Sequence, residues 1–223
     1  MIITDTIMKT THIWFDLEGT LLKNPAYDAA VEDFAYQLYL QETKKAATAE
    51  TKKEFDSLLK QHKRKSLIFV ALGKDKKYYA QAFATQFLFQ NYVVANKNVQ
   101  AVISFLQEKK ICLGVYTSLP RAPLVKILSL LGLNPHDFTL LTGDDVIKGK
   151  PDPEGFEKIV QLCDVAANQI IFVGDSEQKD IIPAKSVGMK TVLVHGNSLL
   201  ADASFMNFEE LLVYFQSFIL EKF

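Results

Sequence analysis

Reactive side chains are concentrated in four short stretches of the chain: FDLEGT, GVYTS, GKPDPEGF and VGDSEQKD. The residues of these stretches that can do chemistry are Asp16, Glu18, Thr117, Ser118, Lys150, Asp175 and Asp180. Carboxylate oxygens are preferred ligands of hard divalent cations such as Mg²⁺. A lysine and two hydroxyl groups can hold the oxygens of an anion. If the fold brings these residues together, they can bind an oxyanion and a divalent cation in one site.

Short apolar runs bounded by turn residues recur along the chain and predict β-strands. They are Ile13–Asp16, Ile111–Thr117, Phe138–Thr142, Ile170–Gly174 and Thr191–Val194. Segments with one apolar helical face separate the later runs: Gln100–Lys109, Pro120–Leu131, Glu154–Cys163 and Ile181–Val187. This alternation predicts an α/β fold with a doubly wound parallel sheet. Ligands of such sheets bind beyond the carboxyl ends of the strands, so the reactive residues are expected at one edge.

The segment of residues 24–92 breaks this alternation, because it contains helical patterns only. Its apolar side chains recur at helical spacing, for example at Phe34 and Leu38. A segment of this length is too long for an ordinary crossover between neighbouring strands. We therefore expect an α/β core domain of residues 1–23 and 93–223. Residues 24–92 are expected to form an inserted helical-bundle cap domain that lies as a lid over the sheet.

The composition excludes several classes of partner. The 223 residues are 48% hydrophobic and 23% charged, and 25 Lys and Arg nearly balance 26 Asp and Glu. A formal net charge of −1 gives no electrostatic case for nucleic acid or an anionic membrane as the main partner. No apolar run approaches the roughly 18 residues of a membrane span. The sequence does not indicate an oligomeric state, and a monomer is compatible with it.

The first residues and the cysteines favour a cytoplasmic protein. The start of the chain lacks the basic residues and long apolar run of a signal peptide. Cys112 and Cys163 both lie in apolar segments, so we expect two buried thiols, which suit a reducing compartment.

Four motifs resemble, in order and spacing, those of the haloacid dehalogenase-like superfamily of hydrolases. FDLEGTLL is similar to its first motif, D-x-D-G-T, and GVYTS to its second. GKPDPEGF is similar to the third, and GDSEQKD followed by IIPAKSVGM to the fourth. The resemblance extends from about His12 to Val194, and the helical insertion lies where the family's first cap type occurs. It implies a Rossmann-like core and a Mg²⁺-dependent phosphatase that acts on a small phosphorylated metabolite.

The resemblance implies that Asp16 is the nucleophile, which takes the phosphoryl group as an aspartyl-phosphate. Asp16 ends a buried strand, where a carboxylate can point rigidly at a ligand. Lys150 would keep this carboxylate ionised and offset the charge on the transferring phosphoryl group. Thr117 matches a position that binds a phosphoryl oxygen, and Ser118 is a second candidate for substrate binding. Both hydroxyls lie where a strand ends and a helix begins, which offers free N–H groups to a phosphate.

The resemblance also implies a Mg²⁺ site at the same place. Asp16 and Asp175 would bind the ion through their carboxylates, and Glu18 through its main-chain carbonyl. Mg²⁺ suits such a site because it takes few protein oxygens and keeps several waters. Asp180 is expected in the first turn of the next helix, where it holds a metal-bound water or positions Lys150.

Glu18 departs from the family pattern, because the family's phosphatases usually carry Asp there as general acid and base. Strand alternation predicts that Asp16 and Glu18 project to the same side. The extra methylene moves the acid by up to about 1.5 Å, and a displacement of about 1 Å can cost about 10²-fold in rate. The enolase-phosphatase branch of the superfamily carries D-x-E-G-T, so Glu is compatible with turnover.

Three interpretations of Glu18 stay open. The protein is a working phosphatase that hydrolyses a small phosphomonoester with Glu18 as acid and base. Alternatively, it is a weak or inactive relative that binds a phosphorylated ligand or partner, or it performs dehalogenase-type hydrolysis on the same scaffold. Dehalogenases of this family do not use the metal, whereas this chain retains both Asp175 and Asp180. The two acids therefore favour phosphate chemistry over dehalogenation.

Overall fold

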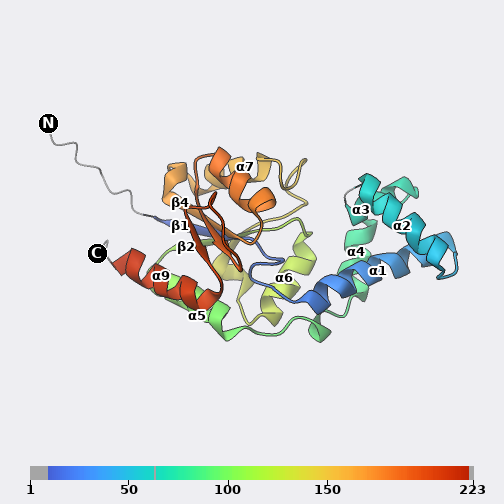
Figure 1. Cartoon of the computed structure of the whole chain (residues 1–223), viewed down its shortest axis with the longest axis horizontal. Coiled ribbons are helices and arrows are strands. Elements are labelled where there is room, and N and C mark those ends of the chain that lie inside the picture. The colour runs from blue at the N-terminus through green and yellow to red at the C-terminus, as the bar shows by residue number, and fades with distance from the viewer. Residues whose placement is uncertain (1–9, 63, 221–223) are drawn as a thin grey trace. The chain divides into compact units, whose positions relative to one another are not determined.

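A single parallel sheet organises the core of the protein. The computed structural model describes residues 10–62 and 64–220, and its sheet has the strand order β3-β2-β1-β4-β5-β6 (Figure 1). The strands are β1 (His12–Phe15), β2 (Cys112–Tyr116), β3 (Phe138–Leu141), β4 (Ile170–Gly174), β5 (Lys190–Val194) and β6 (Ala203–Phe205). All neighbouring pairs are parallel. The predicted doubly wound α/β sheet is confirmed, and the five predicted strands end within one residue of their expected bounds.

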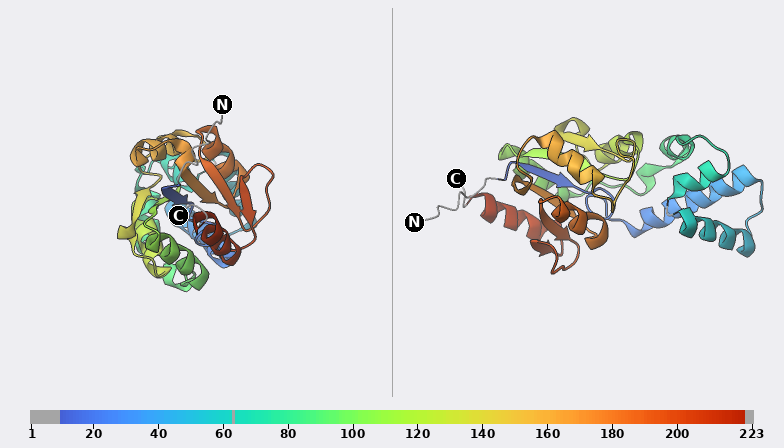
Figure 2. Two further views of the ribbon diagram at one scale, coloured as in Figure 1. Left: turned by 90° about the vertical axis from the view of Figure 1, so that its left-hand side faces the viewer. Right: turned by 90° about the horizontal axis from the view of Figure 1, so that it is seen from above.

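Helices cover both faces of this sheet. They are α5 (Lys97–Glu108), α6 (Arg121–Leu130), α7 (Glu154–Cys163), α8 (Ile182–Ser186) and α9 (Phe208–Leu220). The views in Figures 1 and 2 agree that α5 and α9 lie side by side, and α7 covers the opposite face of the sheet. On the side of the sheet that carries α7 and α8, the core includes Trp14, Tyr116 and Phe172 of the strands and Phe156 of α7. Full burial of each such side chain contributes about 1.5–3 kcal/mol.

The register of the central strands explains why distant residues meet. β1 lies between β2 and β4, and Phe15 is paired with both Val115 and Val173. The backbone N–H of Asp16 continues this ladder by donating to the carbonyl of Val173 at 2.9 Å. The chain segments that leave β1, β2 and β4 therefore emerge next to one another at the carboxyl edge of the sheet.

A helical unit is inserted between β1 and β2, as predicted. The chain divides into two compact units after Lys23 and after Val94. The inserted unit contains α1 (Pro25–Thr43), α2 (Ala49–His62), α3 (Lys65–Ala71), α4 (Tyr78–Gln86) and the 3₁₀ turn η1 (Phe89–Asn91). Asn24 begins α1 as its N-cap, because its side chain accepts a hydrogen bond from the N–H of Ala26 at 3.0 Å. The function of this unit as a cap domain stays a prediction.

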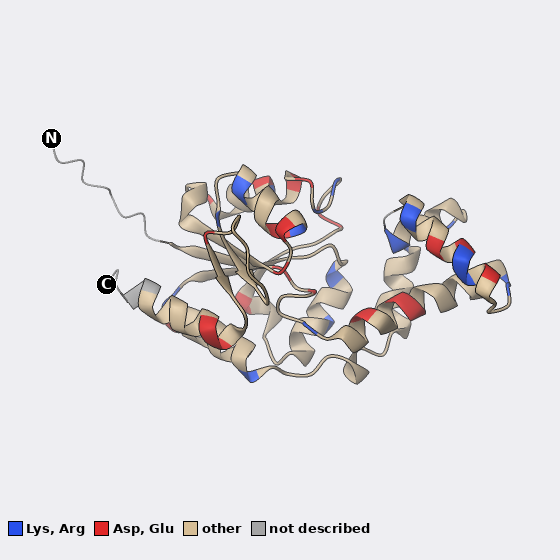
Figure 3. Cartoon of the chain, in the orientation of Figure 1, with Lys and Arg blue, Asp and Glu red and all other residues tan. Residues whose placement is uncertain are grey.

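Aromatic rings form the interior of the inserted unit, and its surface carries ion pairs. Phe34 contacts Tyr79 and Phe83, with centroids 6.3 and 5.6 Å apart. α1 carries acidic residues and α2 carries both acidic and basic ones (Figure 3). Lys52 of α2 pairs with Glu32 of α1 at 3.2 Å. Exposed pairs contribute only about 0–1 kcal/mol each, so burial of the rings contributes more to the stability of this unit than the surface ion pairs do.

The two cysteines lie in different environments. Cys163 is half-buried and accepts a hydrogen bond from the indole N–H of Trp14 at 3.2 Å. Cys112 is exposed, so the prediction of two buried thiols was wrong for this residue. The reason is its position as the first residue of β2, before the strand becomes covered on both faces. Within residues 10–62 and 64–220, no helix is both long enough and apolar enough to cross a membrane.

Candidate active site

Three carboxylates meet at the carboxyl edge of the sheet. One carboxylate oxygen from each of Asp16, Asp175 and Asp180 lies within 4.8 Å of the other two. Asp16 and Asp180 are buried, whereas Asp175 is exposed. Asp16 directly follows β1 and Asp175 directly follows β4. The neighbouring positions of these two strands therefore bring together acids that are far apart in the sequence.

Lys150 lies between two of these acids. Its ammonium donates hydrogen bonds of 2.7 Å to Oδ1 of Asp16 and of 2.7 Å to Oδ1 of Asp180. The Lys150 side chain is only 3% exposed. The other carboxylate oxygen of Asp180 accepts a hydrogen bond from the N–H of Ser176 at 3.1 Å. Asp180 therefore has a partner for both oxygens, and one of its functions in the fold is to hold the lysine.

Aromatic rings complete the surroundings of the Lys150 ammonium. Its nitrogen is 4.8 Å from the ring centroid of Tyr116, 4.9 Å from that of Phe172 and 6.0 Å from that of Phe156. Ring faces attract a cation, which lowers the cost of burying it. Gly155 makes room for this arrangement, because a side chain there would overlap the Tyr116 hydroxyl. These rings were not predicted as part of the site, although Tyr116 and Phe156 both lie within the four motifs.

The electrostatics of the site favour an additional cation. Burial raises the pKa of Asp16 to about 7; Asp180 and Asp175 act in the same direction, and Lys150 opposes them. Burial also raises the pKa of Asp175, again with Asp180 contributing. For Lys150, burial acts to lower the pKa, but Asp16 and Asp180 together raise it above its usual range. Three carboxylates thus face one ammonium, which leaves an excess of negative charge.

An oxygen of Asp16 is available to such a cation. Oδ2 of Asp16 is buried and has no hydrogen-bond partner within the described part of the chain. A buried carboxylate oxygen without a donor is costly, and a divalent ion would satisfy it. The donor set, made only of oxygens, is the chemistry that Mg²⁺ prefers. The residues present therefore fit a magnesium ion.

The turn after β1 depends on Gly19. This glycine has a φ of +93°, and a side chain here would overlap the carboxylate of Asp175. Its N–H donates to the carbonyl of Leu22 at 2.8 Å, and the N–H of Leu22 donates to the carbonyl of Leu17 at 2.8 Å. Glycine is therefore required twice, for the backbone conformation and for the close approach of Asp175.

The remaining predicted site residues lie at the same strand ends. Thr117 is buried, and its Oγ1 accepts a hydrogen bond from the N–H of Leu119 at 3.1 Å. Ser118 is exposed. Glu18 is half-buried, and its carboxylate is not one of the three in the acidic cluster. The expected contribution of Glu18 to metal binding was its main-chain carbonyl, and the roles of all three residues stay predictions.

Asp180 differs from its predicted local structure. It was expected in the first turn of an α-helix, but it lies in a single π-helical turn, η4 (Glu177–Ile181), which precedes α8. The side chain of Ser176 begins this turn by accepting a hydrogen bond from the N–H of Lys179 at 3.3 Å. Single π-helical turns are frequent at functional sites, and this one directs Asp180 toward Lys150.

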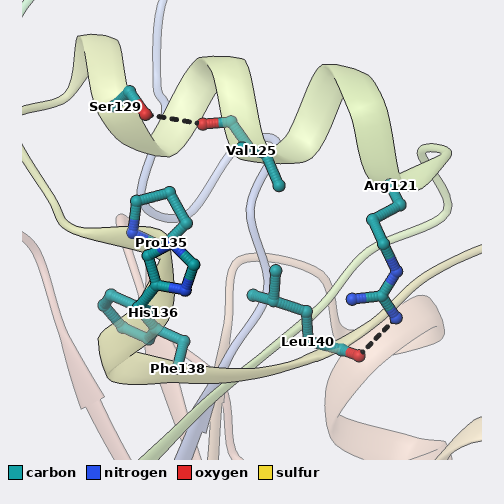
Figure 4. A pocket seen from close by; sticks show the side chains of 7 residues that line it. All are labelled: Arg121, Val125, Ser129, Pro135, His136, Phe138 and Leu140. Carbon is teal, nitrogen blue, oxygen red and sulfur yellow. Dashed lines mark hydrogen bonds between the residues drawn. The ribbon is translucent and has the colours of Figure 1, made fainter.

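A surface pocket of about 600 Å³ lies elsewhere on the core, between α6 and the edge strand β3 (Figure 4). It is lined by Arg121, Val125, Ser129, Pro135, His136, Phe138 and Leu140. The Arg121 guanidinium donates to the carbonyl of Leu140 at 3.0 Å and pairs with Asp145 at 3.2 Å. The Arg121 guanidinium is thus already paired with protein groups. None of the reactive residues of the four motifs lines this pocket.

Curated phosphatases are similar to part of the chain. A plasmid-encoded phosphoglycolate phosphatase from Cupriavidus necator is 36% identical over 96 residues, which is 43% of this chain and 41% of that protein. The aligned segments span less than half of the length of the first curated relatives that the chain matches.

Solved structures share the fold over nearly the whole chain. A HAD phosphatase from Thermococcus onnurineus has a TM-score of 0.67 and 22% identity, covering 92% of this chain and 97% of that one. A HAD-hydrolase from Bacillus subtilis bound to magnesium has a TM-score of 0.64 and 18% identity, covering 93% and 99%. Residues 13–194 match the family described as haloacid dehalogenase-like hydrolase. Because this match covers all four motifs and more than half of the chain, the chain belongs to the haloacid dehalogenase-like hydrolases.

Proposed function

We propose that this protein hydrolyses a small phosphomonoester with the help of Mg²⁺, through an aspartyl-phosphate on Asp16. The observation that carries the proposal is the state of the Asp16 carboxylate. One oxygen accepts a hydrogen bond from Lys150 at 2.7 Å, and the other is buried without a hydrogen-bond partner among the described residues. A structural aspartate would have partners for both oxygens. In Asp16, Oδ1 is bound by Lys150 and Oδ2 is available to a ligand.

In the first step, a carboxylate oxygen of Asp16 attacks the phosphorus atom of the substrate. A bond forms between this oxygen and phosphorus while the bond from phosphorus to the alcohol oxygen breaks. Glu18 donates a proton to the departing alcohol. Lys150 and Thr117 bind the phosphoryl oxygens and offset the charge that develops on them, and Ser118 is a second hydroxyl at the same strand end.

In the second step, water attacks the phosphorus atom of the aspartyl-phosphate. Glu18, which lost its proton in the first step, accepts one from the water. The bond between phosphorus and Asp16 breaks, inorganic phosphate leaves and the carboxylate is restored. The two steps need one residue that alternates between acid and base, and Glu18 is the carboxyl group that follows Asp16 on the same turn.

Asp16, Asp175 and the main-chain carbonyl of Glu18 would hold the magnesium ion. When bound, Mg²⁺ supplies positive charge against the oxygens of the transferring group. Asp180 positions Lys150, because one of its oxygens accepts from the ammonium and the other from the N–H of Ser176. A positioned Lys150 keeps the carboxylate of Asp16 fixed while it reacts.

Steady-state hydrolysis of 4-nitrophenyl phosphate and of a panel of phosphometabolites, with and without Mg²⁺, tests the proposal. Phosphoglycolate belongs in the panel because of the activity named for the curated relative. We expect turnover that requires Mg²⁺ and that falls by at least about 10³-fold in Asp16→Asn, because the amide is not a nucleophile. Circular dichroism checks that the variant is folded.

Two results would replace the proposal. Saturable binding of phosphate esters without any turnover would make the protein a binding relative, which is the second interpretation of Glu18. Release of chloride from a 2-chloro acid without Mg²⁺ would indicate dehalogenase-type hydrolysis. Retention of phosphatase activity in Asp16→Asn would remove Asp16 from the nucleophilic role.

A further inference from the structure

Lys150 is held by a loop that lacks regular secondary structure. Residues 142–153 connect β3 to α7 without a strand or helix. The loop must nevertheless place the Lys150 ammonium within 2.7 Å of both Asp16 and Asp180. The neighbouring Lys148 has a side chain that is 72% exposed, whereas that of Lys150 is 3% exposed. Lys148 and Lys150 thus differ in exposure although they are only two residues apart. The backbone of the loop must therefore be held in one conformation by neighbouring residues.

Glu154, the first residue of α7, holds the middle of this loop. Its Oε1 accepts a hydrogen bond from the N–H of Ile147 at 2.9 Å, and its Oε2 accepts one from the N–H of Lys148 at 2.7 Å. One carboxylate therefore holds two consecutive amides of the loop, directly before the segment Gly149-Lys150. Hydrogen bonds with an ionised acceptor are about twice as strong as neutral ones.

Lys158 reinforces the same contact from the next turn of α7. Its ammonium is 3.1 Å from Oε1 of Glu154 and donates to the carbonyl of Asp145 at 2.6 Å. The first two turns of α7 thus contact the loop at Asp145, Ile147 and Lys148. The donated hydrogen bonds from Ile147 and Lys148 lower the pKa of Glu154 to about 2, so the carboxylate is ionised at neutral pH.

We propose that Glu154 is a positioning residue that keeps Lys150 between Asp16 and Asp180 by holding the loop that carries it. Its effect on turnover rests on the proposed phosphatase function, whereas its effect on the position of Lys150 does not. Glu154 does not touch the reacting groups. It acts on them through the loop backbone, because Lys150 lies two residues after Lys148, whose N–H Glu154 holds. Glu154 itself lies in the first turn of a helix, and residues on helices are positioned more precisely than residues on loops.

Glu157 offers a matched control. It is an exposed acid in the same first turn of α7, so its removal changes the charge near the helix N-terminus to the same degree. The structure records no hydrogen bond from the described loop residues to its side chain. Glu154→Ala and Glu157→Ala therefore differ in the loop contacts and not in the charge.

Acetylation of lysines, followed by peptide mass spectrometry, tests the position of Lys150 without any need for activity. In the wild-type protein and in Glu157→Ala, we expect Lys148 to react at least about tenfold faster than Lys150, because Lys150 reacts only after local opening. In Glu154→Ala, the two rates should approach each other to within about threefold. An unchanged ratio in Glu154→Ala overturns the proposal, whether or not the protein is a phosphatase.

Kinetics then separate positioning from simple loss of stability. We expect kcat of Glu154→Ala to fall by about 10²-fold, as for displacements of about 1 Å at a reacting centre, with a smaller change in KM. Glu154→Gln keeps one acceptor oxygen and should recover part of kcat. Equal kcat in Glu154→Ala and Glu157→Ala would overturn the catalytic part of the proposal. A wild-type protein without phosphatase activity would contradict the proposed function and leave the acetylation result to decide the position of Lys150.

Discussion

Lys150 donates a hydrogen bond of 2.7 Å to the carboxylate of Asp16, across 134 residues of sequence. Both side chains are buried, and Asp180 shares the same ammonium at 2.7 Å. Breaking a buried pair by removing one partner leaves a charge that neither water nor protein compensates. The arrangement therefore makes Lys150 a determinant of stability as well as of chemistry.

Replacing Lys150 by Met should destabilise the metal-free protein by about 3–5 kcal/mol, because Asp16 and Asp180 lose their only common cation within the described residues. Urea denaturation measures this change. Lys148→Met is the matched control, since Lys148 is 72% exposed, and it should change the free energy of unfolding by less than about 0.5 kcal/mol. Equal stability of the two variants would mean that the carboxylates are satisfied without Lys150.

Magnesium should stabilise the protein more at high pH than at low pH. Burial raises the pKa of Asp16 to about 7 from an ordinary value of 3.8, so in this window the folded metal-free protein keeps a proton that the unfolded chain has lost. Its stability therefore falls as pH rises through the window, since the folded state binds more protons. Mg²⁺ competes with that proton, and the competition disappears above the folded pKa.

Thermal unfolding with and without Mg²⁺, at about pH 5.5 and about pH 8, measures this linkage. We expect the increase in Tm on adding Mg²⁺ to be clearly larger at the higher pH. Calorimetry in buffers with different ionisation enthalpies should show proton release on Mg²⁺ binding at the lower pH. A Mg²⁺ effect that is the same at both pH values would contradict a site built on the Asp16 carboxylate.

The strands β1 to β5 could be predicted from the sequence because each of them joins an apolar run to turn residues. For β4 (Ile170–Gly174) and α7 (Glu154–Cys163), the predicted and observed bounds are identical. The edge strand β6 (Ala203–Phe205) was not predicted, because its three residues form no apolar run and its pairing depends on β5. Local pattern is sufficient where a segment is buried on both faces and fails where a neighbour decides the structure.

The acids and the lysine of the site could be predicted from the sequence, but the residues that surround and position them could not. Motif spacing identified Asp16 and Lys150, because strand ends in a parallel sheet converge. It could not identify the rings of Tyr116 and Phe172 around the ammonium, since an aromatic residue in a core strand is expected for packing alone. It also missed Glu154, whose contacts to the loop follow from the turn geometry before α7.

Glu18→Gln should slow the second step more than the first when 4-nitrophenyl phosphate is the substrate. Nitrophenolate leaves without a proton, so the aspartyl-phosphate still forms, whereas its hydrolysis needs a base. We expect a burst of about one nitrophenol per protein molecule followed by turnover that is reduced by about 10²–10⁴-fold. Rapid-mixing kinetics detect the burst, and mass spectrometry of the quenched protein detects the phosphorylated Asp16.

Glu18→Asp is the companion variant for this experiment. It keeps a carboxyl group but shortens the side chain by one methylene, so we expect a loss of at most about 10²-fold, clearly smaller than in Glu18→Gln. Wild-type turnover in Glu18→Gln would remove Glu18 from acid and base catalysis. The same small loss in both variants would indicate that the carboxyl group of Glu18 is the acid or base of neither step.

Gly19→Ala should abolish Mg²⁺ binding, and Gly73→Ala should not. Both glycines have positive φ, +93° and +81°, so alanine strains the backbone in each case. A side chain at position 19 would also overlap the carboxylate of Asp175, whereas nothing lies within 4 Å of the corresponding point at Gly73. The two variants therefore share the backbone cost and differ in the displacement of one carboxylate.

Isothermal titration with Mg²⁺ should give no measurable heat for Gly19→Ala and a wild-type Kd for Gly73→Ala. Wild-type affinity in Gly19→Ala would mean that the position of Asp175 does not matter for the ion, and Asp175 would then lose its assignment as a ligand.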